Sequence, residues 1–385
     1  FVRVVREDPI KRDLLYAGTE TGLYLSLDGG KLWEKFQLNL PIVPITDLTI
    51  RNNDLVASTQ GRSFWILDDL TQIHQYNSKI ESKDFHLFKP GIAYRTSGGS
   101  SKSKTIGQNP PNGAVVIYHL SNKPEEETSA KLEILLNDRV IRTINSKPGE
   151  SAIMFDNGSY SSPTISLKKG MNRFIWNFRV DDITMVKDVS FYGSYSGYRI
   201  GPDNYTVRLT IGEVSMDQPL IVKRDPRVEV KDRDNRTHQQ MMSDLYIQIN
   251  DLHSSISKAR NIKTQIKKMN NEIEGMDNMN ELLQTGKDAI QALNEWEGDV
   301  IQTKMETFQD VVNFLNRLNS HMINLLGTID RSDPPLTQGQ IDRYSDLTDE
   351  WYNYKKILDE IINNQIRSYN ELHRSAGLPA IIIND

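Results

Sequence analysis

The chain of 385 residues contains no cysteine, which excludes disulfides and thiolate metal sites. It also lacks an excess of charge: 46 Lys and Arg oppose 51 Asp and Glu, a net charge of −5. This balance offers no electrostatic attraction for a nucleic acid or an anionic membrane surface. No apolar run approaches the roughly 18–20 residues that span a bilayer. We therefore expect no nucleic-acid partner and no transmembrane segment in this chain.

Familiar catalytic and cofactor motifs are missing as well. There is no G-x-S-x-G, no phosphate-binding glycine loop and no EF-hand spacing. The seven histidines include no pair at positions i and i+4 with zinc-site spacing. His253 and His321 fall on predicted helices and could meet there, but an exposed helix-face position is expected for both. The sequence predicts no catalytic residues, no cofactor and no metal.

The first 80 residues contain an internal repeat. At a shift of 40, five positions match exactly in residue type: Leu15, Ala17, Thr19, Leu27 and Asp28 align with Leu55, Ala57, Thr59, Leu67 and Asp68. The two copies predict short strands over 14–19, 22–28, 33–36, 46–50, 54–59 and 63–68. A period near 40 with about four short strands is typical of a β-propeller blade. A propeller needs roughly four to eight blades to protect its strand edges. Residues 1–82 are therefore expected to be the last two blades of an Asp-box β-propeller, with the rest upstream.

The octapeptide "SLDGGKLW" at 26–33 is an Asp-box, a motif found in many proteins labelled as sugar hydrolases. Here it is predicted to be a structural turn. Asp28 can accept hydrogen bonds from the following backbone amides, and Gly30 permits a positive-φ turn. Ser26 can add a side-chain bond, and Trp33 can pack the returning strand onto the blade. Glycoside hydrolysis would need two carboxylates flanking a cleft, and the octapeptide supplies one.

The middle of the chain, residues 83–230, is predicted to be an immunoglobulin-like β-sandwich. Alternating apolar and polar residues run over 114–120, 130–145, 172–180 and 204–223. Turn residues at 137–138 and 212–213 predict two hairpins. About seven or eight strands are expected, with Trp176 filling the space between the two sheets.

Residues 231–385 are predicted to form a four-helix bundle-like domain. Apolar residues recur at steps of three and four from Met242 to Ile266, which indicates one long amphipathic helix. Further helices are expected over 279–305, 307–329 and about 337–373. Thr337 and Gln340 form a predicted capping box for the last of these. The fold class is therefore multidomain β + α: terminal propeller blades, an immunoglobulin-like sandwich and an antiparallel helical bundle.

The segment "DLVASTQGRSFWILDDLTQI" at 54–73, with "LLYAGTETGLYLSLDGGKLW", resembles sortilin-like Asp-box (BNR-repeat) propeller proteins of Bacteroidota, often labelled "glycosyl hydrolase". The resemblance implies a structural last-blade motif, formed by Gly61, Arg62, Trp65, Asp68 and Asp69. "GMNRFIWNFR" at 170–179 resembles that family's sandwich domain, and "NELHRSAGLPAI" at 370–381 its closing helical region. Gln60 departs from the family pattern, which usually has His there.

The family implies an exported protein in the periplasm or on the outer-membrane surface of a Gram-negative bacterium. Some relatives accompany the type IX secretion and gliding apparatus. We accordingly expect a non-catalytic interaction or scaffold protein of the cell envelope, with other envelope or secretion proteins as partners. Two alternatives stay open. One is a glycan-processing or glycan-binding enzyme whose active site lies in the missing blades, and the other is a sortilin-like peptide receptor.

Overall fold

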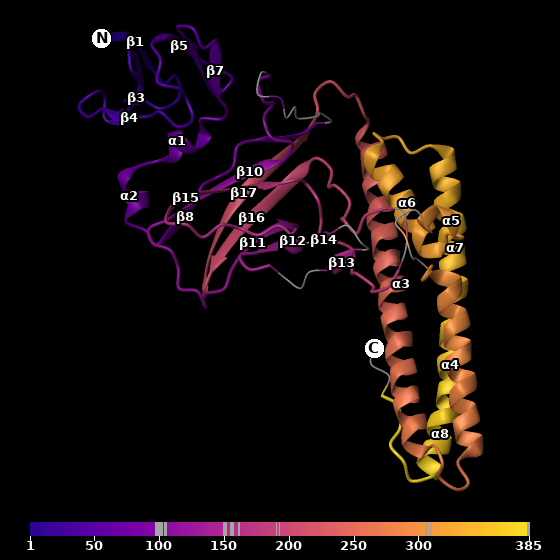
Figure 1. Ribbon diagram of the computed structural model, residues 1–385. Coiled ribbons are helices and arrows are strands. Elements are labelled where there is room, and N and C mark those ends of the chain that lie inside the picture. The colour runs from indigo at the N-terminus through magenta and orange to yellow at the C-terminus, as the bar shows by residue number, and fades with distance from the viewer. Residues whose placement is uncertain are drawn as a thin grey trace. The chain divides into compact units, whose positions relative to one another are not determined.

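The computed structural model describes residues 1–96, 103, 106–148, 152–154, 158–160, 162–189, 191, 193–304, 307 and 310–382. It combines β-sheets with helices in two compact units (Figure 1). The sheet unit comprises Phe1–Pro148, Pro163–Phe178 and Gly201–Pro226, and the helical unit comprises Gly149–Ser162, Arg179–Ile200 and Arg227–Asp385. The chain is thus a multidomain β + α protein. The bounds of the three predicted domains stay a prediction.

The first 67 residues form two small antiparallel sheets. The strands of the first are β1 (Val2–Glu7), β2 (Leu15–Thr19), β3 (Gly22–Ser26) and β4 (Glu34–Lys35), and those of the second are β5 (Ile45–Arg51), β6 (Asp54–Thr59) and β7 (Phe64–Leu67). Tyr16 and Leu23 of the first sheet share a buried core with Leu48 and Leu55 of the second. The strands that the repeat predicts are all present, whereas β1 lies outside the repeat and was not predicted.

Two short helices follow these sheets, α1 (Thr71–Gln75) and α2 (Ser78–Glu81), and a buried carboxylate links α1 to the first sheet. Asp8 Oδ2 accepts the Tyr16 hydroxyl at 3.1 Å and lies 2.9 Å from His74 Nε2. Lys11 Nζ donates to the Tyr76 carbonyl at 2.6 Å, just beyond the end of α1. Burial and the neighbouring Asp8 charge raise the pKa of Tyr16, which keeps its hydroxyl protonated as a donor. These contacts fix α1 against the strand ends.

The larger strands of the sheet unit form one sheet of three strands and one of five. The first has the order β15-β10-β8 and the second β12-β11-β16-β17-β9, in which β9 alone is parallel to its neighbour. Their bounds are β8 Phe85–Leu87, β9 Ala93–Arg95, β10 Ala114–Leu120, β11 Ala130–Leu136, β12 Arg139–Asn145, β15 Gly170–Trp176, β16 Asp203–Ile211 and β17 Val214–Arg224. A further hairpin, β13 (Ala152–Met154) with β14 (Gly158–Tyr160), belongs to the helical unit. The two predicted hairpins are confirmed by the β11–β12 and β16–β17 pairings.

The core of these larger sheets forms as the alternation predicts. On β10, every second residue from Ala114 to Leu120 is buried. Trp176 is 1% exposed and makes edge contacts with Phe178 and Tyr205, with ring centroids 5.7 and 5.8 Å apart. The expectation that Trp176 fills the interior is therefore confirmed.

The helical unit differs from the prediction in where its helices end. Its helices are α3 Asp232–Ile273, α4 Asn280–Val300, α5 Asp310–Asn313, α6 Leu318–Arg331, α7 Gln338–Ile361, a π-helical turn Ile362–Ile366 and α8 Arg367–Ser375. The helix expected over 279–305 ends at Val300, and the one expected over 307–329 is broken between α5 and α6. The capping box is confirmed: Gln340 N donates to Thr337 Oγ1, and Gln340 Oε1 accepts from Thr337 N at 2.9 Å.

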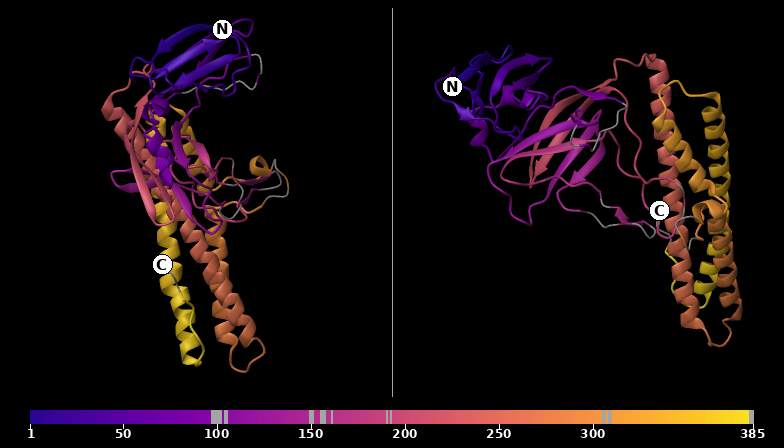
Figure 2. Two further views of the ribbon diagram at one scale, coloured as in Figure 1. Left: turned by 90° about the vertical axis from the view of Figure 1, so that its left-hand side faces the viewer. Right: turned by 45° about the horizontal axis from the view of Figure 1, so that its top comes forward.

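Hydrogen bonds along α3 reveal how the helices are arranged. Going down α3, His238, His253, Arg260, Lys263 and Asn270 bond to residues 329, 319, 297, 294 and 283. The partner numbers fall steadily, so α6 and then α4 follow one another along α3 in the antiparallel sense. On α7 and α8 the partners rise, from Tyr344 to Tyr369, so this leg runs parallel to α3. The helices therefore form three rows, which we call legs: α3, α6 followed by α4, and α7 followed by α8. The three legs lie side by side, as Figure 2 shows from two directions.

Among the described residues, no helix combines the length and the apolar character that crossing a membrane requires.

Candidate functional site

The Asp-box is a closed turn at the end of β3. Asp28 Oδ1 accepts the backbone amides of Lys31 at 3.0 Å and Leu32 at 2.9 Å, and the Ser26 hydroxyl at 2.8 Å. Ser26 Oγ in turn accepts the amide of Gly30 at 2.9 Å, where φ is +90°. The bonds from Leu32 and Ser26 hold the pKa of Asp28 below its usual value. Every bond named here closes the turn on itself, and the Trp33 ring lies beside Gly30.

The last-blade motif is likewise built from local contacts. Trp65 Nε1 donates to the Arg62 carbonyl at 3.0 Å, next to Gly61 at φ +83°. Asp69, at φ +55°, accepts from the side-chain amide of Asn53 at 2.8 Å. Burial and the neighbouring acids Asp54 and Asp69 raise the pKa of Asp68, although Arg173 opposes this rise. The five motif residues thus lie within one hairpin and the turn that follows it.

Asp330 of α6 is a buried carboxylate held by two arginines. Its Oδ2 lies 3.0 Å from Arg179 Nη2, and its Oδ1 accepts the backbone amide of Arg199 at 2.7 Å and lies 3.4 Å from Nε of the same residue. Arg179 and Arg199 are thereby both fastened to the end of α6. The arrangement leaves the carboxylate fully engaged, which is typical of a structural ion pair.

His253 corrects the expectation of an exposed position. Its ring is buried, with Nδ1 bonded to the Thr184 carbonyl and Nε2 2.6 Å from Asn319 Oδ1. His321 is exposed, as expected. Burial lowers the pKa of His253, whereas its hydrogen bonds to Asn319 and Thr184 oppose that shift. His253 is therefore a core residue at the junction of α3 and α6.

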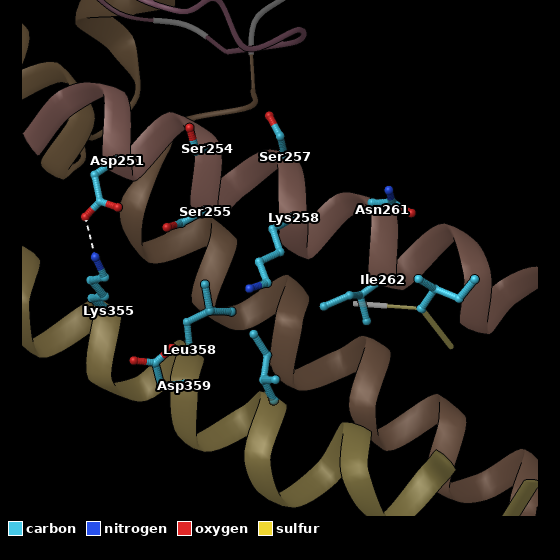
Figure 3. Close-up of a pocket in the computed structure, with 12 residues that line it drawn as sticks. Asp251, Ser254, Ser255, Ser257, Lys258, Asn261, Ile262, Lys355, Leu358 and Asp359 are labelled. Atoms are coloured by element: carbon cyan, nitrogen blue, oxygen red, sulfur yellow. Dashed lines mark hydrogen bonds and ion pairs between the residues drawn. The ribbon is translucent and has the colours of Figure 1, made fainter. Parts of the chain in front are cut away.

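An open groove of about 440 Å³ lies between the parallel helices α3 and α7 (Figure 3). On α3 it follows residues 251–262, where Ser254, Ser255 and Ser257 stand beside the buried apolar stripe. Serine side chains are too short to fill the space that longer residues would cover. Ile262 and Leu358 are buried and provide apolar walls. The sequence alone did not predict this groove, although the serine run beside the apolar stripe is a visible signal.

Charges of both signs line the groove. Asp251 Oδ2 lies 2.7 Å from Lys355 Nζ and accepts Trp351 Nε1 at 3.1 Å, closing one end (Figure 3). Lys258 and Asp359 lie farther along. The mixture favours a polar, nearly neutral occupant over a strongly charged one.

Near the other end of the groove, two side-chain amides hold an extended piece of the chain. Asn370 Oδ1 accepts the amide of Ile381 at 2.7 Å, and its Nδ2 donates to the carbonyl of the same residue at 3.3 Å. Gln265 Oε1 likewise accepts the amide of Ile382, and its Nε2 donates to the carbonyl of the same residue, with both bonds at 2.9 Å. Neighbouring residues of an extended chain direct their backbone groups to opposite edges. The two amides therefore hold the segment from both sides, as two flanking strands would.

Comparisons with known proteins identify no relative. No family model matches the chain, and no curated protein matches it. One solved structure, pT26-6p, aligns at 11% identity over 72% of this chain and 49% of its own length, with a TM-score of 0.11. This chain thus spans about half of that protein. No likeness of fold follows from a score so low. In the described part of the chain, no group of three or more His, Asp or Glu side chains is placed to hold a metal ion.

Proposed function

We propose that this chain belongs to a non-catalytic interaction protein of the bacterial cell envelope, and that the α3–α7 groove receives an extended segment of a partner protein. The observation that carries the proposal is the pair of amides at Asn370 and Gln265. Both amides bond to backbone groups of residues 381–382, and Ile382 itself lines the groove. Recognition of an extended chain through its backbone is a common mode of peptide binding.

The dimensions of the groove fit such an occupant. Residues 251–262 of α3 span about 16 Å at 1.5 Å per residue. That length accommodates roughly five residues of extended chain. The Ser255 hydroxyl can donate and accept hydrogen bonds, so it can pair with either backbone group of a bound segment. The apolar walls at Ile262 and Leu358 can cover alternate side chains.

We further propose that the two sheets of residues 2–67 are neighbouring propeller blades in a sortilin-like Asp-box protein. Their exposed outer faces support this assignment. Phe64 and Ile66 of β7 are 73% and 59% exposed on the face away from the shared core, and Val5 of β1 is 45% exposed. Apolar residues in this position are suited to packing against further blades. The Asp28 carboxylate is engaged in its own turn, which favours an architectural role for the Asp-box over a catalytic one.

The β8–β17 region is proposed to be the immunoglobulin-like spacer, and the three helical legs the docking bundle. Support for the first comes from Tyr205, whose hydroxyl donates to the Gly201 carbonyl at 2.8 Å near the start of β16. A tyrosine bonded to backbone a few residues upstream occurs at the corner of many such sandwiches. Export to the periplasm or the outer-membrane surface, and an association with secretion proteins, follow from the family resemblance.

A groove-filling substitution tests the proposal. Ser255→Trp should close the groove, while Thr264→Trp places the same side chain on an exposed position of α3 outside it. Tagged protein is recovered from solubilised envelopes, and its companions are quantified by mass spectrometry. A companion that is captured by the wild type and Thr264→Trp but lost with Ser255→Trp supports the proposal. Identical companions for all three proteins, or none, contradict it.

A further inference from the structure

Two histidines that lie 33 positions apart in sequence meet on neighbouring strands of the three-stranded sheet. His86 of β8 and His119 of β10 are directly opposite in the antiparallel register. Their side chains therefore project from the same face, with Cβ atoms about 4.5–5.5 Å apart. The adjacent positions Leu87, Tyr118 and Leu120 are buried, so this is the outer face of the sheet.

Both imidazoles have a nitrogen without a partner. Nδ1 of His86 and Nδ1 of His119 are shielded from solvent, and neither makes a hydrogen bond. Buried polar atoms in native proteins nearly always have a partner, and an ion is one of the groups that supplies it. Phe88 holds the His86 ring in an edge contact with centroids 4.8 Å apart. The sheet thus places two imidazoles, each with an unpartnered nitrogen, at directly opposite positions of neighbouring strands.

A thioether completes the row. Met171 of β15 is directly opposite His119 on the other side of β10, so its side chain shares the same face. It is 51% exposed, which is high for a methionine in a sheet. The three strands thus place His86, His119 and Met171 in one line across the sheet.

We propose that His86, His119 and Met171 form a binding site for a copper(I) ion. Imidazole suits several transition metals, but a thioether is a soft ligand that selects copper(I) over zinc. Bonds of about 2 Å from each nitrogen to one ion are compatible with the spacing of opposite residues. Histidine binds metals through its neutral imidazole. This site is independent of the proposed partner groove.

Competition with a chromophoric copper(I) chelator under anaerobic conditions tests the site. The wild type should withdraw one equivalent of copper(I) from the chelator. His86→Ala and His119→Ala should each weaken binding by more than the roughly 10-fold that loss of an outer-shell partner costs. His321→Ala removes an exposed histidine of α6 and should bind as the wild type does. Failure of the wild type to compete, or unchanged binding by both sheet variants, would overturn the proposal.

Met171→Leu tests the choice of metal. It should weaken copper(I) binding while leaving zinc(II) binding by the two imidazoles unchanged, and an unaltered copper(I) affinity would refute the thioether ligand.

A measurement on the wild type avoids any failure of the alanine variants to fold. Copper(I) should shift the ring signals of two of the seven histidines in an NMR spectrum. A spectrum in which no histidine signal moves would contradict the site.

Discussion

Replacing Asn370 with alanine tests whether a side-chain amide holds the extended segment. If the segment stayed in place, the amide and carbonyl of Ile381 would both be left buried and unpaired. Each unpaired group costs about 1–3 kcal/mol, so staying would cost about 2–6 kcal/mol. Detaching instead exposes the Ile381 side chain, which costs about 1.5–3 kcal/mol and is partly offset by regained chain freedom. Detachment is therefore the expected response.

Hydrogen–deuterium exchange of the peptide covering 378–382 measures this outcome. In Asn370→Ala its amides should exchange as in an unfolded chain, while α3 and α7 keep their protection. Gln265→Ala should have a smaller effect, because Ile382 is 69% exposed and water can replace the lost partner. Gln291→Ala is a matched control, since that exposed side-chain amide donates to the Glu295 side chain on the same helix. Unchanged exchange of 378–382 in Asn370→Ala would refute the reasoning.

Three further predictions concern stability. Gly286→Ala would place a Cβ 2.6 Å from the Asn270 side-chain amide. The midpoint of urea unfolding should therefore fall by the equivalent of about 1–3 kcal/mol. An unchanged midpoint would contradict this close approach. Asp330→Ala leaves two arginines without their buried carboxylate, so the free energy of unfolding in urea should fall by about 3–5 kcal/mol. Asp342→Ala, on the exposed face of α7, should leave the free energy of unfolding nearly unchanged. Because the folded pKa of Asp28 lies below its unfolded value of 3.8, its contribution is present above pH 4 and is lost as pH falls through the folded pKa. Asp28→Asn should therefore flatten the acid limb of the stability–pH curve below pH 4, and an acid limb identical to the wild type would refute it.

Features that depend on a few neighbouring residues could be predicted from the sequence. The hairpin turn at Asn137-Asp138 takes positive φ angles of 50° and 63°, which these two residue types tolerate better than most. The Asp-box turn and the capping box of α7 are similar cases, since each satisfies backbone amides by side chains three or four positions away. Local hydrogen-bonding chemistry decides such structures, so their sequence signals are strong.

Features that depend on the alignment of distant segments were missed. The burial of His253 follows from the positions of Asn319 and Thr184, which lie 66 and 69 residues away. The pairing of His86 with His119 depends on the register of β8 against β10, and the periodicity of either strand leaves that register open. The α3–α7 groove depends in the same way on which helices become neighbours. The arrangement of the three legs depends on α4 and α6 both packing along α3. The sequence of each helix alone predicts an ordinary amphipathic helix and does not indicate which helix it packs against.

The most direct test of the partner groove is site-specific photo-crosslinking in intact cells. A photoreactive phenylalanine analogue is placed at Ser255 inside the groove or at Thr264 outside it, and the crosslinked peptides are sequenced. The proposal predicts that Ser255 crosslinks to one contiguous segment of a partner protein and that Thr264 does not. Crosslinks from Ser255 only to this chain's own residues, or the same scattered products from both positions, would contradict it.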